Sequence, residues 1–377
     1  MPRFLIIVFV LIVSTLWGGD VSSRSFDVPE GSYQVTITFG SETEASETTV
    51  FAESRQLLLE KIRTEPGEFV VRQIHVNTRI PQVTPPPPFA PGADTVILND
   101  REIGIARWDQ KLTLDFMGSS PAVSDVQIEP APEIPVIYLV GDSTVTDQSI
   151  GDQASWGQML PRFFDGSVAI ANHAESGETL KSFIFTNRLN KVLATLSARD
   201  TVLIQFGHND QKPHWPQTYV APHTTWPAYL RAYLAEIRLR GATPVLVTPM
   251  ERRKFSAAGR IISTHGDYPQ VVRDLAAEEG VALIDLQPIS VALYEALGPD
   301  RARLAFAKGG QDGTHHNAYG AYQLALAIAH GIKASAVPVA PLLITDLPKL
   351  DPSTPSPPEE FDLLLPISAS SPPLPKN

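Results

Sequence analysis

The stretch Pro135-Val-Ile-Tyr-Leu-Val-Gly-Asp-Ser-Thr144 decides the fold of this chain. Its apolar residues follow one another without alternation and include β-branched side chains, which is typical of a strand buried on both faces of a parallel sheet. The run ends at Gly141, so Ser143 lies just beyond the carboxyl end of the strand. Ligands of open α/β sheets bind at that edge. Ser143 is therefore a candidate nucleophile, provided that the chain supplies the groups that such a serine needs.

Strand and helix patterns alternate strictly after this stretch. Further strands are predicted at residues 167–171, 201–206, 243–248 and 281–285, and helices at 156–164, 189–197, 225–240, 268–279 and 318–332. Such alternation predicts a parallel sheet with helices on both faces and right-handed crossovers. The resulting three-layer α/β domain spans residues 136–335, a size suited to one domain.

Residues 24–128 carry a different pattern, in which apolar and polar residues alternate. Every second residue is apolar from Tyr33 to Phe39, and the same alternation returns from Leu112 to Phe116. Half-buried strands of this kind predict an antiparallel β-sandwich. Residues 129–135 are rich in proline and are predicted to form a stiff linker between the two domains.

The two ends of the chain are predicted to lie outside these domains. Arg3 precedes an unbroken apolar run from Phe4 to Val13, and smaller, polar residues follow. This pattern is typical of a secretory signal peptide over residues 1–23, with an uncleaved amino-terminal anchor as the alternative. In either case we expect the body of the protein to be exported, to the periplasm or out of the cell. Residues 336–377 are rich in Pro and Ser and are predicted to form a disordered tail.

Composition excludes several classes of function. The chain has 41 acidic and 30 basic residues and a formal charge of -11, with no basic run, so we expect no nucleic-acid partner. No segment after the amino-terminal one is long or apolar enough to predict a membrane span. Cysteine is absent, which excludes disulfides, thiolate zinc sites and thiol nucleophiles. The sequence carries no signal for the oligomeric state.

A serine hydroxyl becomes an effective nucleophile when a base takes its proton and a third group orients that base. Asp312-Gly-Thr-His315 lies immediately before the last predicted helix. The spacing lets the carboxylate reach one imidazole nitrogen while the other nitrogen faces outward. His316 competes with His315 for this role, and the Asp-x-x-His spacing favours His315.

The reaction also needs hydrogen-bond donors for a developing oxyanion. Asn209 follows the predicted strand 201–206, and its amide can donate without titrating. Gly177 lies on the loop after the strand 167–171 and can offer a backbone N–H. Turns favour glycine and asparagine in any case, so each motif is weak when taken alone. Four such motifs in this order, each on a loop at the same sheet edge, predict a hydrolase.

Together these blocks resemble those of the SGNH (GDSL-type) hydrolases. They read Gly141-Asp-Ser-Thr144, Gly177, Gly207-His-Asn-Asp210 and Asp312-Gly-Thr-His315. The chain is most similar to the rhamnogalacturonan acetylesterase branch, in Trp156-Gly-Gln-Met-Leu-Pro161, Thr248-Pro-Met-Glu-Arg-Arg253 and Thr264-His-Gly-Asp-Tyr-Pro269. The leading β region is similar to the galactose-binding-like sandwich that precedes some of these esterases.

The resemblance implies a flavodoxin-like three-layer fold, no metal or other cofactor, and removal of acetyl groups from a pectic polysaccharide, rhamnogalacturonan in particular. It implies Ser143 as the nucleophile, with Asp312 and His315 completing the triad. It also implies an oxyanion hole formed by the backbone of Ser143 and Gly177 and by the side chain of Asn209. An acetylated polysaccharide is thus the expected partner.

The residues leave several points open. Arg252, Arg253 and His265 are candidate sugar contacts, with a solvated charged loop as the alternative. The family usually has Gly-Arg-Ser where this chain has Gly177-Glu178-Thr179, and the reversed charge of Glu178 would repel an acidic uronate. Two other functions stay possible: an SGNH esterase, lipase or thioesterase acting on another acyl substrate such as acetylxylan, or a non-catalytic glycan-binding protein.

Overall fold

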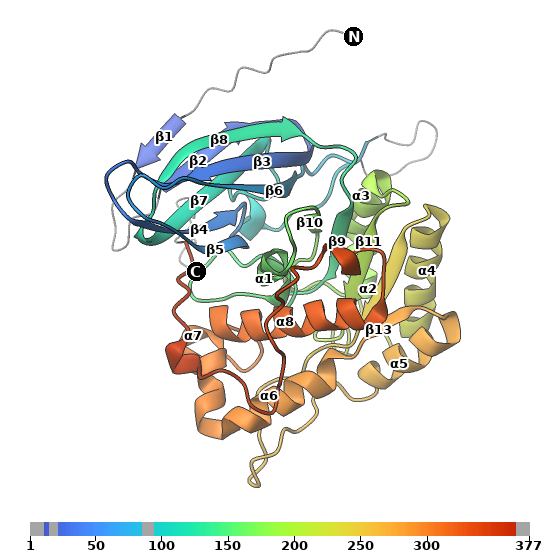
Figure 1. Cartoon of the computed structure of the whole chain (residues 1–377). Coiled ribbons are helices and arrows are strands. Elements are labelled where there is room, and N and C mark those ends of the chain that lie inside the picture. Colours follow the sequence, from blue (N-terminus) through green and yellow to red (C-terminus); the bar gives the residue numbers. More distant parts are fainter. Residues whose placement is uncertain (1–10, 15–21, 85–93, 367–377) are drawn as a thin grey trace.

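The structure is a computed structural model that describes residues 11–14, 22–84 and 94–366 (Figure 1). Its amino-terminal part is built from antiparallel sheets, and its carboxyl-terminal part from one parallel sheet flanked by helices. The predicted fold class is thereby confirmed. The predicted signal peptide, residues 1–23, lies for the most part outside the described residues.

Two antiparallel sheets form the leading β region. The larger sheet contains β1 (Leu11–Ser14), β2 (Ser22–Asp27), β7 (Lys111–Ser120), β4 (Ser46–Ala52) and β5 (Gln56–Thr64), and the smaller contains β6 (Val70–Thr78), β3 (Gly31–Phe39) and β8 (Val123–Pro130). Apolar side chains of both sheets share one core, to which β3 contributes Val35 and Ile37 and β7 contributes Leu112 and Leu114. These are the apolar positions of the alternating pattern, so the alternation of apolar and polar residues indicates which face of each strand is buried.

The parallel sheet has its first strand near the middle. Its strands are β9 (Val136–Gly141), β10 (Ala169–Asn172), β11 (Thr201–Gln205), β12 (Thr243–Val247) and β13 (Ala282–Ile284), arranged β10-β9-β11-β12-β13. Counted along the chain, this order is 2-1-3-4-5, the flavodoxin-like arrangement. All four pairs of neighbouring strands are parallel.

Helices cover both faces of the sheet. One face carries α1 (Trp156–Met159), α6 (Leu286–Arg301) and α8 (Ala318–Ser335), and the other carries α2 (Leu180–Phe185), α3 (Arg188–Thr195), α4 (Thr225–Leu239) and α5 (Tyr268–Glu279) (Figure 1). Alternate residues of β9 serve the two cores: Ile137 packs with the first group and Tyr138 with the second. A short α7 (Ala307–Gly310) precedes α8.

The sequence patterns did not predict α2 and α6. The predicted helix 156–164 is α1 followed by a 3₁₀ turn that contains Pro161, which has no N–H to continue an α-helix.

Two predicted boundaries are wrong. Strand β8 runs to Pro130, which pairs with Tyr33, so the linker is shorter than residues 129–135. Residues 336–366 are not a disordered tail. Leu343 and Leu363 are buried in the core beneath α8, and the Tyr319 hydroxyl donates to the Ser356 carbonyl at 2.7 Å. Residues 336–366 form only the short 3₁₀ turns Ala340–Leu342 and Pro358–Glu360, but the prolines of this segment do not prevent its leucines from packing. Residues 367–377 lie outside the described part.

The β region is joined to the α/β domain by packing and hydrogen bonds. Phe51 and Leu57 belong to the same core as α1 and α8. The Gln158 amide of α1 donates to the Ser54 carbonyl at 2.7 Å, and the His75 ring of β6 meets the Gly166 carbonyl at 2.5 Å. The β region is therefore in a position to contribute to a site on the sheet. No helix in the described residues is both long and apolar enough to cross a bilayer.

Candidate active site

The predicted catalytic residues meet at the carboxyl edge of the sheet. The His315 Nε2 atom lies 2.9 Å from the Ser143 hydroxyl, and its Nδ1 atom lies 2.9 Å from a carboxylate oxygen of Asp312. Ser143 follows β9, while the other two residues lie on the turn before α8. The histidine thus contacts the serine with one ring nitrogen and the acid with the other, which is the geometry that general-base activation of a hydroxyl requires.

The turn before α8 is held by the same carboxylate that orients the histidine. Asp312 Oδ1 accepts hydrogen bonds from the backbone N–H groups of Thr314 at 2.7 Å and His315 at 2.9 Å. Burial raises the pKa of Asp312, but these bonds and the His315 ring outweigh it and hold the pKa below its usual range. The acid is therefore ionised at neutral pH. The competing residue, His316, is buried and meets the Tyr294 hydroxyl at 2.7 Å.

The turn after β9 fixes the serine. The Asp142 carboxylate accepts from the Thr144 backbone N–H at 3.0 Å and from its hydroxyl at 2.8 Å. A Cβ atom on Gly141 would lie 2.6 Å from the Gln205 carbonyl of the neighbouring strand, so only glycine fits there. Behind this turn lies His208, whose Nδ1 is 3.4 Å from the Asp142 carboxylate. Burial lowers the pKa of His208 to about 4, so its ring is neutral at neutral pH.

Donors for an oxyanion are present on three neighbouring loops. Among the described residues, none accepts a hydrogen bond from the backbone N–H of Ser143 or Gly177, so both remain available. Gly177 has a φ of +88°, a left-handed conformation that favours glycine. The Asn209 amide donates one hydrogen to the Glu178 carbonyl at 3.2 Å, and its oxygen accepts from Lys212 at 2.8 Å. The second amide hydrogen is left for a ligand. The oxyanion role of these groups stays a prediction.

The three candidate sugar contacts have different environments. His265 is wholly buried and lies edge-on against His208, so the prediction that it contacts sugar is wrong. Arg252 donates to the His208 carbonyl at 2.9 Å, and Arg253 donates to the Gly310 carbonyl at 2.8 Å, close to the turn that carries Asp312. Both arginines are partly accessible, and their contact with a sugar stays a prediction.

The expected repulsion by Glu178 is not found. This side chain is 4% exposed, and its carboxylate lies 3.2 Å from the Arg188 guanidinium. It also accepts hydrogen bonds from the hydroxyls of Ser182 and Thr186. Because the charge is buried and paired inside the protein, it does not face a ligand at the acyl site.

A set of buried ion pairs that the sequence did not reveal connects the β region to this edge. Arg107 Nη1 lies 2.6 Å from the Glu175 carboxylate, and Arg188 Nη2 lies 2.5 Å from Glu102. Arg107 and Glu102 come from the segment before β7, whereas Glu175 and Arg188 belong to the α/β domain. Their partners are distant in sequence, so no local motif could have predicted the pairs.

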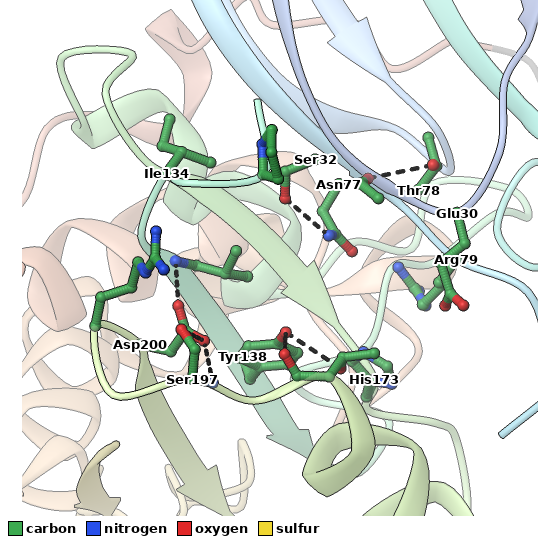
Figure 2. Close-up of a pocket in the computed structure, with 15 residues that line it drawn as sticks. Glu30, Ser32, Asn77, Thr78, Arg79, Ile134, Tyr138, His173, Ser197 and Asp200 are labelled. Atoms are coloured by element: carbon green, nitrogen blue, oxygen red, sulfur yellow. Dashed lines mark hydrogen bonds between the residues drawn. The ribbon is translucent and has the colours of Figure 1, made fainter. Parts of the chain in front are cut away.

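Cavities lined by described residues border the α/β domain at opposite ends of its strands. One, of about 260 Å³, opens beside His315 and is walled by Arg101 and Ile105 of the β region and by Gln148 and Ile150 of the loop after β9. The other, of about 230 Å³, lies at the amino ends of β9 and β11, where Figure 2 shows Asn77, Tyr138 and Asp200 around it. Only the first adjoins the triad. In the described residues no three His, Asp or Glu side chains are grouped so as to hold a metal ion.

The chain is similar to proteins of known family and structure. The profile of the GDSL-like Lipase/Acylhydrolase family matches residues 139–322. A rhamnogalacturonan acetylesterase of Bacillus subtilis (strain 168) is 36% identical over 222 residues, which make up 55% of this chain and 94% of that protein. An uncharacterized esterase of the same organism, YxiM, is 26% identical over 326 residues, covering 85% of this chain and 76% of that protein. The crystal structure of YxiM has the same fold, with a TM-score of 0.51 and 24% identity over 84% of this chain and 81% of that one.

Proposed function

The chain belongs to the GDSL-like lipase/acylhydrolase family and is therefore an ester hydrolase; we propose that it removes O-acetyl groups from an acetylated plant-type polysaccharide, with rhamnogalacturonan as the first candidate. The observation that carries the proposal is the contact of His315 with Ser143 on one side and with Asp312 on the other. The relatives named as rhamnogalacturonan acetylesterases support the choice of substrate.

In the proposed reaction, Ser143 Oγ attacks the acetyl carbonyl carbon while His315 Nε2 takes the hydroxyl proton. The N–H groups of Ser143 and Gly177 and the Asn209 amide stabilise the oxyanion of the tetrahedral intermediate. His315 then returns the proton to the sugar oxygen, which leaves as an alcohol, and the acetyl group stays on Ser143. A water molecule then attacks the acetyl carbon while His315 takes its proton, and His315 passes that proton to Ser143 Oγ as the bond between Oγ and the acetyl carbon breaks and acetate leaves.

The amino-terminal pattern supports a further part of the proposal, that the enzyme acts outside the cytoplasm. A charged residue followed by an apolar run is typical of an export signal, and a polymeric plant substrate is met outside the cell. Fusing residues 1–23 to a reporter that is active only after export tests this directly, and a reporter that stays in the cytoplasm would contradict it.

Acetate release from a panel of acetylated pectins, xylans and mannans tests the activity. We expect release from the acetylated pectin, and loss of at least about a thousandfold in kcat for Ser143→Ala, since a triad without its nucleophile retains only the contribution of binding and the oxyanion hole. Ser124→Ala, an exposed serine of β8, is the matched control and should keep full activity. Equal activity in Ser143→Ala would refute the mechanism, and binding without acetate release from any polymer would favour a glycan-binding protein.

A further inference from the structure

Arg101 is a positively charged residue of the β region that lies at the carboxyl edge of the parallel sheet, near the triad. It lies in the 3₁₀ turn Asp100–Glu102, before β7. Its Nε atom donates to the Glu175 carboxylate at 2.6 Å, and its Nη2 atom donates to the Ser176 carbonyl. Ser176 immediately precedes Gly177, so these bonds hold the guanidinium beside the loop that offers an oxyanion donor.

Arg101 lines the cavity that adjoins the triad. His315 and Gln148 line the same cavity, and the Gln148 amide donates to the Ser143 carbonyl at 2.7 Å. A ligand whose ester reaches Ser143 from this side therefore has other groups within the cavity. Ile150, which is about half exposed, gives the cavity an apolar surface on which a sugar face can pack.

Arg101 is more exposed to solvent than the acidic residues that line this cavity. Its side chain is 45% exposed, whereas the lining carboxylates Glu102, Glu175 and Asp147 are each no more than 3% exposed. Glu175 is also shared with Arg107, at 2.6 Å, so Arg101 does not hold that carboxylate alone. Although the whole chain is acidic, a ligand in the cavity meets a cation and no exposed carboxylate of the lining.

The hydrogen-bond geometry of Arg101 leaves one edge of the guanidinium open. A guanidinium has five N–H donors, of which Nε–H and one Nη2–H are used here. Among the described residues, none accepts from Nη1. The remaining edge therefore presents parallel N–H groups from Nη1 and Nη2, the pair that binds a carboxylate with both oxygens.

We propose that Arg101 binds the carboxylate of a uronate residue in the acetylated chain while the acetyl ester lies at Ser143. This inference rests on the proposed function and specifies it: the substrate is an acidic polysaccharide, and the β region selects it. Arg101 is a specificity residue in this scheme, because it contacts the sugar chain and not the reacting ester.

Three substrates test the proposal: an acetylated oligosaccharide with free uronates, the same oligosaccharide after methyl esterification of its carboxylates, and p-nitrophenyl acetate. For Arg101→Gln we expect kcat/KM on the free-uronate substrate to fall about tenfold to hundredfold, mainly through KM, as loss of a hydrogen bond to a charged group predicts. The other two substrates should change less than about threefold. Arg101→Lys keeps the positive charge but loses the paired N–H groups of the guanidinium. Its kcat/KM on the free-uronate substrate should lie between those of the wild type and Arg101→Gln.

Arg72→Gln is the matched control, because Arg72 is an exposed arginine of the β region whose side chain bonds only its neighbour, the Val71 carbonyl, among the described residues. It should behave as the wild type. Equal losses of Arg101→Gln on all three substrates, or no loss on any, would overturn the proposal. So would a wild-type enzyme that hydrolyses the methyl-esterified and free-uronate substrates equally well, a measurement that needs no variant.

The outcomes also separate this inference from the proposed function. A wild-type enzyme that releases acetate from neutral acetylated xylan but shows no preference for a free carboxylate overturns only the role of Arg101. A wild-type enzyme that releases acetate from no polysaccharide at all overturns both.

Discussion

Replacing Glu102 with Gln should destabilise the protein by about 3 kcal/mol. Glu102 is 1% exposed, and its carboxylate accepts hydrogen bonds from Arg188 at 2.5 and 3.1 Å and from the Trp108 indole at 2.9 Å. Burial raises the pKa of this carboxyl, but Arg188 and Arg107 outweigh burial and lower the pKa to about 2 from an ordinary value of 4.5. At about 1.4 kcal/mol for each pH unit, this lowering of the pKa corresponds to about 3 kcal/mol of folding stability. Breaking a buried ion pair costs about 3–5 kcal/mol, which is consistent.

The effect has a defined pH dependence. The folded protein holds the proton of Glu102 more weakly than the unfolded chain does, so acid favours unfolding. The stabilisation is complete above pH 4.5 and is lost as the pH falls through about 2. Urea unfolding, followed by tryptophan fluorescence between pH 7 and pH 3, should show that the difference in unfolding free energy between wild type and variant falls by more than half at pH 3.

The matched control is Glu129→Gln, at an exposed glutamate of β8, which should change the free energy of unfolding by less than about 0.5 kcal/mol. A Glu102→Gln difference below about 1 kcal/mol at pH 7, or one that stays constant down to pH 3, would refute the reasoning from the ion pair. Either result would mean that the loop before β7 is held by something other than this carboxylate.

Two further substitutions test the triad and the carboxyl-terminal segment. Asp312→Asn should lower kcat on p-nitrophenyl acetate by about 10³–10⁴-fold with little change in thermal stability, because an amide neither holds the required His315 tautomer nor stabilises its cation; a loss below tenfold would contradict the role of Asp312. Leu363→Ala should lower the free energy of unfolding by about 2–3 kcal/mol in urea titrations, because Leu363 is 8% exposed, while Leu364→Ala, at a residue 67% exposed, should have almost no effect. Equal effects of the two would show that the segment is not packed.

The parts of the structure that the sequence predicts are those that local patterns determine. The unbroken apolar run that ends at Gly141 indicates a buried parallel strand, and Asp312 and His315 are close enough in sequence to meet within one turn. Helix α6 was missed because prolines lie near both of its ends, at Pro288 and Pro299. A proline in the first turn is compatible with a helix, since the N–H groups there have no partner in any case.

Long-range contacts account for what the sequence could not predict. The charge of Glu178 could be read from the sequence, but its burial against Arg188 depends on how α2 and α3 pack. The bond between Arg101 and Glu175 joins residues 74 positions apart. Proline content predicted a disordered tail, whereas residues 336–366 are packed, because a few leucines and the surface of α8 that receives them determine the packing there.

The position of Arg101 has a consequence for how substrate preference could diverge within such enzymes. The cavity beside His315 is walled on one side by the loop of a β region that the matched family profile, residues 139–322, does not include. Changes in that loop can alter which sugar is accepted while the turns that carry Ser143 and Asp312 stay the same. Two chains with identical catalytic motifs can therefore differ in specificity. Sorting such chains by substrate requires comparing their leading β regions, and an exchange of that region between two of them would transfer the preference.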